Sequence, residues 1–202
     1  MHMARAFLTW TGLALALALP LTLAAMSEYL AWRDPVYIGA GLAGVLALCL
    51  LLLQPLLARS WLPGLQVLHG RRVHRAVGVI LVMAVVAHVA GLWITSPPDI
   101  IDALLLRSPT PFSVWGVTAM WALLAAALLS VLRRRLAPRV WRIGHMSLVS
   151  IVVLGTAVHA LLIDGTMETT SKTALCVLAI AATIAAVVTL WLPSRRRTLT
   201  SK

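Results

Sequence analysis

Residues 74–95 read HRAVGVILVMAVVAHVAGLWIT, an unbroken apolar stretch that contains a single charged residue, Arg75. At about 1.5 Å per residue, an α-helix of this length measures about 33 Å, enough to cross the hydrocarbon layer of a membrane. Two histidines, His74 and His88, lie in this stretch, fourteen residues apart. The stretch therefore predicts a membrane-spanning helix that carries two ionisable side chains.

The rest of the chain has the same character. Of its 202 residues, 61% are apolar and 11% are charged, and the mean hydropathy is +0.95. This composition excludes a soluble globular protein and a disordered chain, and two cysteines exclude a disulfide scaffold. Five further apolar stretches are predicted spans: 7–25, 36–57, 111–132, 140–163 and 173–192. We therefore predict an all-α membrane protein, a six-transmembrane-helix bundle formed by one domain over residues 1–202.

The net charge of +11 reflects an uneven distribution of basic residues among the loops. Fourteen of the 17 basic residues lie on one predicted side of the membrane, and all six acidic residues lie on the other. Those fourteen are Arg5, Arg59, Arg71, Arg72, Arg75, Arg133, Arg134, Arg135, Arg139, Arg142, Arg195, Arg196, Arg197 and Lys202. The positive-inside rule then places both termini in the cytoplasm. Because the charges follow topology, we expect no nucleic-acid partner.

One motif has a misleading form. Residues 39–44, GAGLAG, match the glycine pattern of dinucleotide-binding loops. That interpretation requires a preceding strand and a βαβ unit, whereas this stretch lies within a predicted span. We interpret these glycines as sites of close helix packing.

Four of the six histidines lie in two predicted spans, and their spacing repeats. His74 and His88 are fourteen residues apart, and so are His145 and His159. Fourteen residues bring a helix back to within about 40° of the same face after a rise of about 21 Å. Both spans run in the same direction. His74 is therefore predicted level with His145 on the inner side, and His88 level with His159 on the outer side.

Two bis-imidazole sites at different depths favour haem over a compact metal centre. A separation of about 21 Å prevents all four histidines from binding one ion. A haem fits between two helices and takes one axial imidazole from each; with both axial positions filled, such a site carries electrons. We predict that Gly78 and Gly155 allow the ring to approach a helix closely, and that Arg71, Arg75 and Arg142 bind its propionates. His69 is predicted to be a loop residue.

These residues resemble the ferric reductase-like transmembrane domain family. The resemblance rests on His74-Arg75-Ala76-Val77-Gly78, on His88, on Trp141-Arg142-Ile143-Gly144-His145 and on His159, and it covers about residues 40–192. The family includes ferric reductases, the membrane half of NADPH oxidases and the haem subunit of a bacterial periplasmic methionine sulfoxide reductase system. The resemblance implies a di-haem cytochrome b domain in which His74 and His145 bind the inner haem iron and His88 and His159 the outer one.

The resemblance also suggests partners. Many members carry a C-terminal flavin and nicotinamide domain, which this sequence lacks. FAD and NAD(P)H are therefore expected only through a separate partner, unless the sequence is part of a longer flavin-fused protein. We expect a cytoplasmic flavin reductase or a membrane quinol as donor. The expected acceptor is a periplasmic protein, ferric iron or O₂. A quinone is a further candidate cofactor, and the bacterial inner membrane is the expected location.

Whether the chain is itself an enzyme depends on that acceptor. A ferric complex or O₂ would make it an oxidoreductase, whereas a protein acceptor would make it a haem-bearing subunit. A second hypothesis is a membrane transporter that uses its intramembrane histidines as a proton relay or as metal sites. It predicts charged partners inside the spans, and all six acidic residues lie outside them. A third is a structural membrane subunit.

Overall fold

The computed structural model describes residues 2–191, and the basic residues Arg195, Arg196, Arg197 and Lys202 lie outside that range. The described residues form six helices long and apolar enough to cross a membrane, which confirms the predicted all-α class and number of spans. These are α1 (His2–Ala25), α2 (Pro35–Ala58), α3 (Val67–Thr95), α5 (Pro111–Val131), α6 (Pro138–Leu162) and α7 (Thr169–Trp191). Three short helices connect them: η1 (Glu28–Leu30), α4 (Pro97–Leu104) and η2 (Leu132–Arg135).

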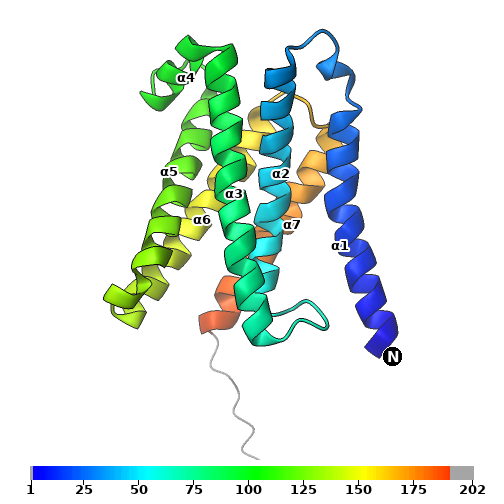
Figure 1. The fold of residues 1–202 in the computed structure, drawn as a ribbon, viewed down its shortest axis with the longest axis vertical. Coiled ribbons are helices and arrows are strands. Elements are labelled where there is room, and N and C mark those ends of the chain that lie inside the picture. The colour runs from blue at the N-terminus through cyan, green and yellow to red at the C-terminus, as the bar shows by residue number, and fades with distance from the viewer. Residues whose placement is uncertain (1, 192–202) are drawn as a thin grey trace, which may run out of the picture.

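The helices run up and down, so the connections alternate between two ends of the bundle (Figure 1). We call the end with the N-terminus and the α2–α3 and α5–α6 connections the inner end. The opposite end, with α4, is the outer end. All six acidic residues lie in or beside the connections of the outer end: Glu28, Asp34, Asp99, Asp102, Asp164 and Glu168. The charge separation predicted from the sequence is thus retained in the fold, and cytoplasmic termini remain a prediction.

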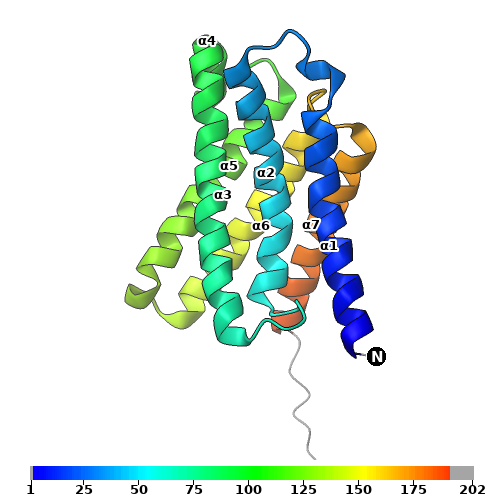
Figure 2. The same ribbon diagram turned by 45° about the vertical axis from the view of Figure 1, so that its right-hand side comes forward.

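Two helical hairpins form the centre of the bundle. Helix α3 packs along α2, and α6 packs along α5, while α7 lies against both α2 and α6. Helix α1 contacts α2 and α7 at the edge of the bundle, as the two views agree (Figures 1 and 2). Large apolar side chains such as Ile80, Met83 and Trp121 are at least half exposed. Such exposure would be costly in water but is expected for helices surrounded by lipid.

Prolines mark where helices begin. Pro35, Pro97, Pro111 and Pro138 occupy the first turns of α2, α4, α5 and α6, where the missing N–H costs nothing. One sequence-based expectation is wrong. His69, predicted to be a loop residue, lies in the first turn of α3, because that helix begins at Val67, seven residues before the apolar stretch.

Helix α7 begins after a glutamate that caps it. The carboxylate of Glu168 accepts hydrogen bonds from the backbone N–H groups of Thr170 and Ser171, both at 2.8 Å. These bonds favour the charged form and lower the pKa of Glu168 to about 2. A carboxylate with a lowered pKa stabilises the folded chain above its unfolded pKa, and this contribution disappears as the pH falls toward 2.

We therefore expect Glu168→Gln to lower the thermal unfolding temperature slightly at pH 7. The difference from the unchanged chain should shrink below pH 4.5 and vanish below pH 2, where the carboxylate is protonated in both the folded and the unfolded chain. Thermal unfolding in detergent across this pH range measures it. Glu28→Gln, another exposed glutamate at the outer end, is the control. A difference that is independent of pH would contradict the capping role.

Candidate functional site

The four intramembrane histidines lie on α3 and α6, and neither helix is interrupted between its two histidines. The fourteen-residue spacing therefore separates the two histidines of each helix by about 21 Å along the bundle. His74 and His145 lie toward the inner ends of α3 and α6, and His88 and His159 lie toward their outer ends. The fold thus places one histidine of each helix at each of two matching levels, and the pairing across the two helices remains a prediction.

In the outer pair, each imidazole is held by a backbone carbonyl of the neighbouring helix. His88 Nδ1 donates to the carbonyl oxygen of Ala40 on α2 at 2.8 Å. His159 Nδ1 donates to the carbonyl oxygen of Phe112 on α5 at 2.9 Å, and its ring meets the Phe112 ring edge-on at 5.9 Å. A carbonyl can only accept, so the proton of each neutral ring is on Nδ1. The Nε2 lone pair is left available to a metal.

The inner pair is held by longer bonds. His74 Nδ1 donates to the carbonyl oxygen of Gln54 at 3.2 Å. His145 Nδ1 lies 3.4 Å from the hydroxyl oxygen of Ser130, which itself donates to the carbonyl of Ala126 at 2.8 Å. Because the Ser130 proton is used in that bond, the Ser130 oxygen accepts from His145. All four histidines therefore share one tautomer, with Nε2 free.

Two glycines that the sequence analysis did not connect with the histidines lie directly against the outer pair. A Cβ on Gly44 would be 2.9 Å from His88 Nδ1, and a Cβ on Gly116 would be 2.6 Å from His159 Nδ1. Each glycine follows the accepting carbonyl, of Ala40 or Phe112, by four residues. Gly44 belongs to the GAGLAG stretch, whose glycines are predicted to allow close helix packing. Gly44 does allow a close approach of α3, and the group that approaches is the imidazole of His88.

The two hairpins thus repeat one device: a carbonyl, a glycine one turn later, and a histidine on the following helix. The histidine follows its carbonyl by 48 residues in the first hairpin and by 47 in the second. No sequence motif marks this device, since its parts lie on different helices. The signal that could have revealed it is the nearly equal separation of Gly44 from His88 and of Gly116 from His159, 44 and 43 residues.

The predicted haem-contacting glycines occupy helix contacts within each hairpin. A Cβ on Gly78 would approach the Gln54 amide of α2 at 3.6 Å. A Cβ on Gly155 would lie 3.1 Å from both the Ala119 side chain and the Trp115 carbonyl of α5. These glycines bring the helices of a hairpin together, and their role toward a ring remains a prediction. Arg71, Arg75 and Arg142 are exposed at the inner end, so they too remain candidates.

Between the two histidine pairs lies a buried aliphatic layer. Leu81 on α3 and Val152 on α6 are each seven residues from both histidines of their helix, and both are 4% exposed. They belong to a core cluster that also includes Ala47, Leu50, Leu51, Ala84, Ala122 and Val153. The cluster separates the inner pair from the outer pair with apolar packing.

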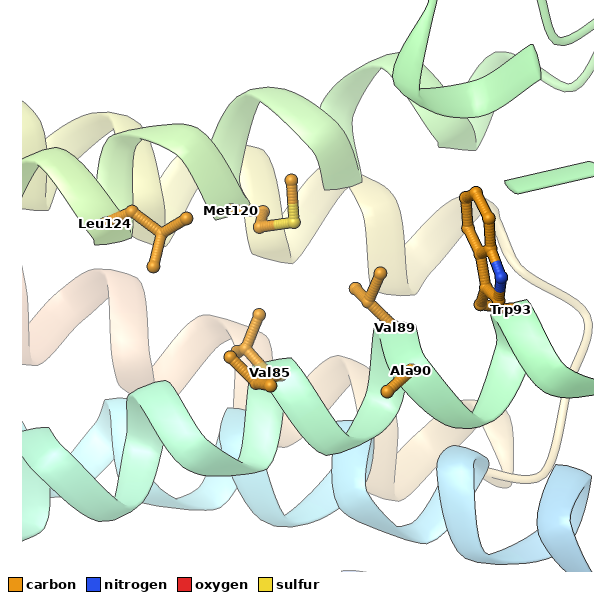
Figure 3. Close-up of a pocket in the computed structure, with 7 residues that line it drawn as sticks. Val85, Val89, Ala90, Trp93, Met120 and Leu124 are labelled. Atoms are coloured by element: carbon orange, nitrogen blue, oxygen red, sulfur yellow. The ribbon is translucent and has the colours of Figure 1, made fainter. Parts of the chain in front are cut away.

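An apolar cavity of about 250 Å³ opens between α3 and α5 at the level of His88. Figure 3 shows its side chains directed toward one another across the space between the two helices. Its lining consists of Val85, Val86, Val89, Ala90, Trp93, Met120 and Leu124. Its lining contains none of the four histidines and no residue of α6.

The outer end of α6 is tied to α7. The ammonium group of Lys172, a residue only 5% exposed, donates to the carbonyl oxygen of Ile163 at 2.6 Å. Ile163 follows α6 directly and lies one turn after His159. A cation at a helix C-terminus satisfies a free carbonyl and interacts favourably with the helix dipole. Lys172 therefore fixes the end of the helix that carries the outer ligand.

The residues present fit haem. Four imidazoles with Nε2 free could supply two ligands at each of two depths, as bis-histidine haem sites require. Within residues 2–191, no group of three or more His, Cys, Asp or Glu side chains is arranged to hold a metal ion without such a ring. The glycines beside His88 and His159 carry no side chain, and a Cβ at either position would push the imidazole ring out of place.

The sequence model of the family described as "Ferric reductase like transmembrane component" matches residues 43–156, more than half of the chain. The chain belongs to this family. The ferric reductase-like match includes His74, His88 and His145 and ends three residues before His159. Membership implies electron transfer across a membrane by a multi-pass protein, and the family typically binds haem. No curated protein and no solved structure matches the chain.

The Ser130 hydroxyl offers a test of how the inner pair is held. If His145 binds an inner haem, we expect Ser130→Ala to weaken its binding about tenfold. His145 Nδ1 then loses the Ser130 hydroxyl and keeps only the nearby Ala126 carbonyl, and changes around metal ligands typically cost 10–100-fold in affinity. Ser150→Ala is the matched control, since that hydroxyl bonds only its own helix, at Met146. The rate of haem transfer to excess apomyoglobin measures the effect. Equal rates in both variants would contradict the role of Ser130.

Proposed function

We propose that the chain carries electrons across a membrane through two b-type haems held between α3 and α6. His74 and His145 would hold the inner haem, and His88 and His159 the outer one. Each haem, when bound, supplies an iron that alternates between its ferric and ferrous states. The chain's own residues bind and orient these groups and exclude water from them.

One observation carries the proposal: each histidine is fixed through Nδ1 by an acceptor on a neighbouring helix. Such outer bonds orient a metal-ligating imidazole and raise its basicity. A proton relay would instead need rings free to exchange protons at both nitrogens. The carbonyls of Ala40 and Phe112 keep Nδ1 protonated. A fixed proton on Nδ1 is expected of a permanent metal ligand and not of a proton relay.

A haem iron held by two histidines would have no open position for a substrate, so we infer electron transfer as the role of both sites. The aliphatic layer around Leu81 and Val152 keeps the space between the sites dry. Electrons can pass over this distance, whereas ions cannot cross it without polar partners.

The charge distribution supports an orientation with both termini in the cytoplasm, in the inner membrane of a bacterium. The exposed arginines of the inner end, Arg71, Arg72, Arg75 and those of residues 133–142, would attract an acidic cytoplasmic flavin reductase by electrostatic steering. A membrane quinol is the alternative donor. The outer haem would deliver electrons to a periplasmic protein, ferric iron or O₂.

Vesicles that contain trapped ferricyanide test this function. With the purified protein in the bilayer, dithionite added outside should reduce the ferricyanide inside, because electrons cross through the chain. Protein-free vesicles and vesicles with His88→Ala should show only slow background reduction. Transmembrane reduction no faster than in protein-free vesicles would contradict the proposed function.

A further inference from the structure

Two buried N–H groups lack an acceptor at the inner end of the bundle. Within residues 2–191, neither Trp141 Nε1 nor Arg59 Nε has a hydrogen-bond partner, although both atoms are buried. A buried donor without a partner destabilises the folded chain, and more so when it is charged. Two such donors at the inner end of the bundle indicate a place for an acceptor there.

Both groups lie just beyond the inner histidine pair. Trp141 precedes His145 by one helical turn, and the two rings stack with centroids 5.4 Å apart and planes 12° from parallel. Arg59 follows Gln54, whose carbonyl holds His74, by five residues, a rise of about 7.5 Å toward the inner end. One donor therefore comes from each hairpin, and each lies on the inner side of a ligand.

The protein offers these donors no carboxylate. All six acidic residues lie at the outer end, so no acidic side chain can reach Trp141 or Arg59. The other arginines near the inner pair are exposed to solvent, where water satisfies them. Residues 2–191 thus supply no acceptor for the two buried donors, whereas a bound molecule with a carboxylate would.

We propose that Trp141 Nε1–H and Arg59 Nε–H bind the propionate carboxylates of the inner haem. The inference rests on the proposed function, since it assumes a haem between His74 and His145. Carboxylates are strong acceptors, and their bonds to N–H groups are charge-assisted. Trp141 then acts twice, since its ring covers the His145 imidazole and its N–H holds the cofactor. Both residues add to the exposed arginines as propionate partners.

Stacking and hydrogen bonding can be separated by changing the protein and the cofactor together. Trp141→Phe keeps an aromatic ring over His145 and removes the N–H. Haem dimethyl ester keeps the iron and the ring system and removes both negative charges. Such a double-mutant cycle isolates the interaction between the two changed groups. The readout is the rate at which excess apomyoglobin removes cofactor from the reconstituted full chain.

With haem, one of the two phases of loss should be about 10–100-fold faster in Trp141→Phe, and the other should be unchanged. With the dimethyl ester, the variant and the unchanged chain should lose cofactor at rates within about threefold, as expected without the charge-assisted bond. Trp121→Phe is the control, because this side chain on α5 is 57% exposed. Equal loss of haem with and without the N–H would overturn the role of Trp141. If Trp141→Phe accelerated loss of the ester as much as loss of haem, the role of Trp141 would also be overturned, because the effect would then come from ring stacking and not from the N–H.

Arg59→Met gives an independent test that does not disturb the aromatic pair. It should also accelerate loss of haem but not of the ester, whereas Arg5→Met, the same charge change on α1, should do neither. Equal haem loss in both arginine variants would overturn the assignment of Arg59. A chain that binds neither haem nor its ester would overturn the proposed function, an outcome distinct from failure of this inference.

Discussion

Replacing His88 with alanine should remove one haem from each chain and leave the other in place. His88 and His159 form one site, and the inner pair is about 21 Å away, beyond the aliphatic layer around Leu81 and Val152. Loss of one axial ligand therefore should not disturb the other site. The pyridine haemochrome assay should fall from two haems per chain to one.

The matched controls lie on the same helix. His74→Ala should also leave one haem, but that haem should have the spectrum and reduction potential that His88→Ala loses. His69→Ala, an exposed histidine in the first turn of α3, should keep both haems. If His88→Ala lost both haems or neither, the pairing of the four histidines would be wrong.

Gly116→Ala should abolish or strongly weaken binding of the outer haem. The added Cβ would lie 2.6 Å from His159 Nδ1 and 2.7 Å from its Cε1, distances that force the ring to move. A shifted ring loses its hydrogen bond to the Phe112 carbonyl and the orientation of Nε2 that metal binding requires. Because disturbing the support of a metal ligand typically costs 10–100-fold in affinity, we expect at least a tenfold faster transfer of one haem to apomyoglobin.

Gly44→Ala should do the same more mildly, since its Cβ would lie 2.9 Å from His88 Nδ1. Gly39→Ala is the matched control on α2, because nothing lies within 4 Å of a Cβ there. Alanine at Gly39 should leave both haems bound as in the unchanged chain. Unchanged haem retention in Gly116→Ala would show that the glycine does not support the site.

Much of the architecture could be predicted because a bilayer restricts the choices. Apolar length, proline positions and loop charges define the helices, and the spacing of His74, His88, His145 and His159 gives their depths. The prediction failed at helix starts that are polar. The first two turns of α3 contain His69, Arg71 and Arg72, so hydropathy alone places the beginning of the helix too late.

The support of the histidines could not be predicted, because it depends on which helices pair. Ala40, Phe112 and Ser130 contribute a carbonyl or a hydroxyl, groups that leave no specific trace in a sequence. Gly44 becomes informative only when α3 is known to pack along α2 at that height. The same holds for Trp141: its place at a span end predicts an interfacial aromatic, whereas its unpartnered N–H appears only in the folded chain.

Electron paramagnetic resonance of the oxidised protein, purified from haem-replete cells, shows whether four histidines hold two haems, because it counts the haem irons and reports their ligands. We expect only low-spin signals of bis-imidazole iron, which integrate to two per chain. A high-spin signal of comparable intensity, a total of one iron or fewer per chain, or a colourless preparation would contradict this expectation.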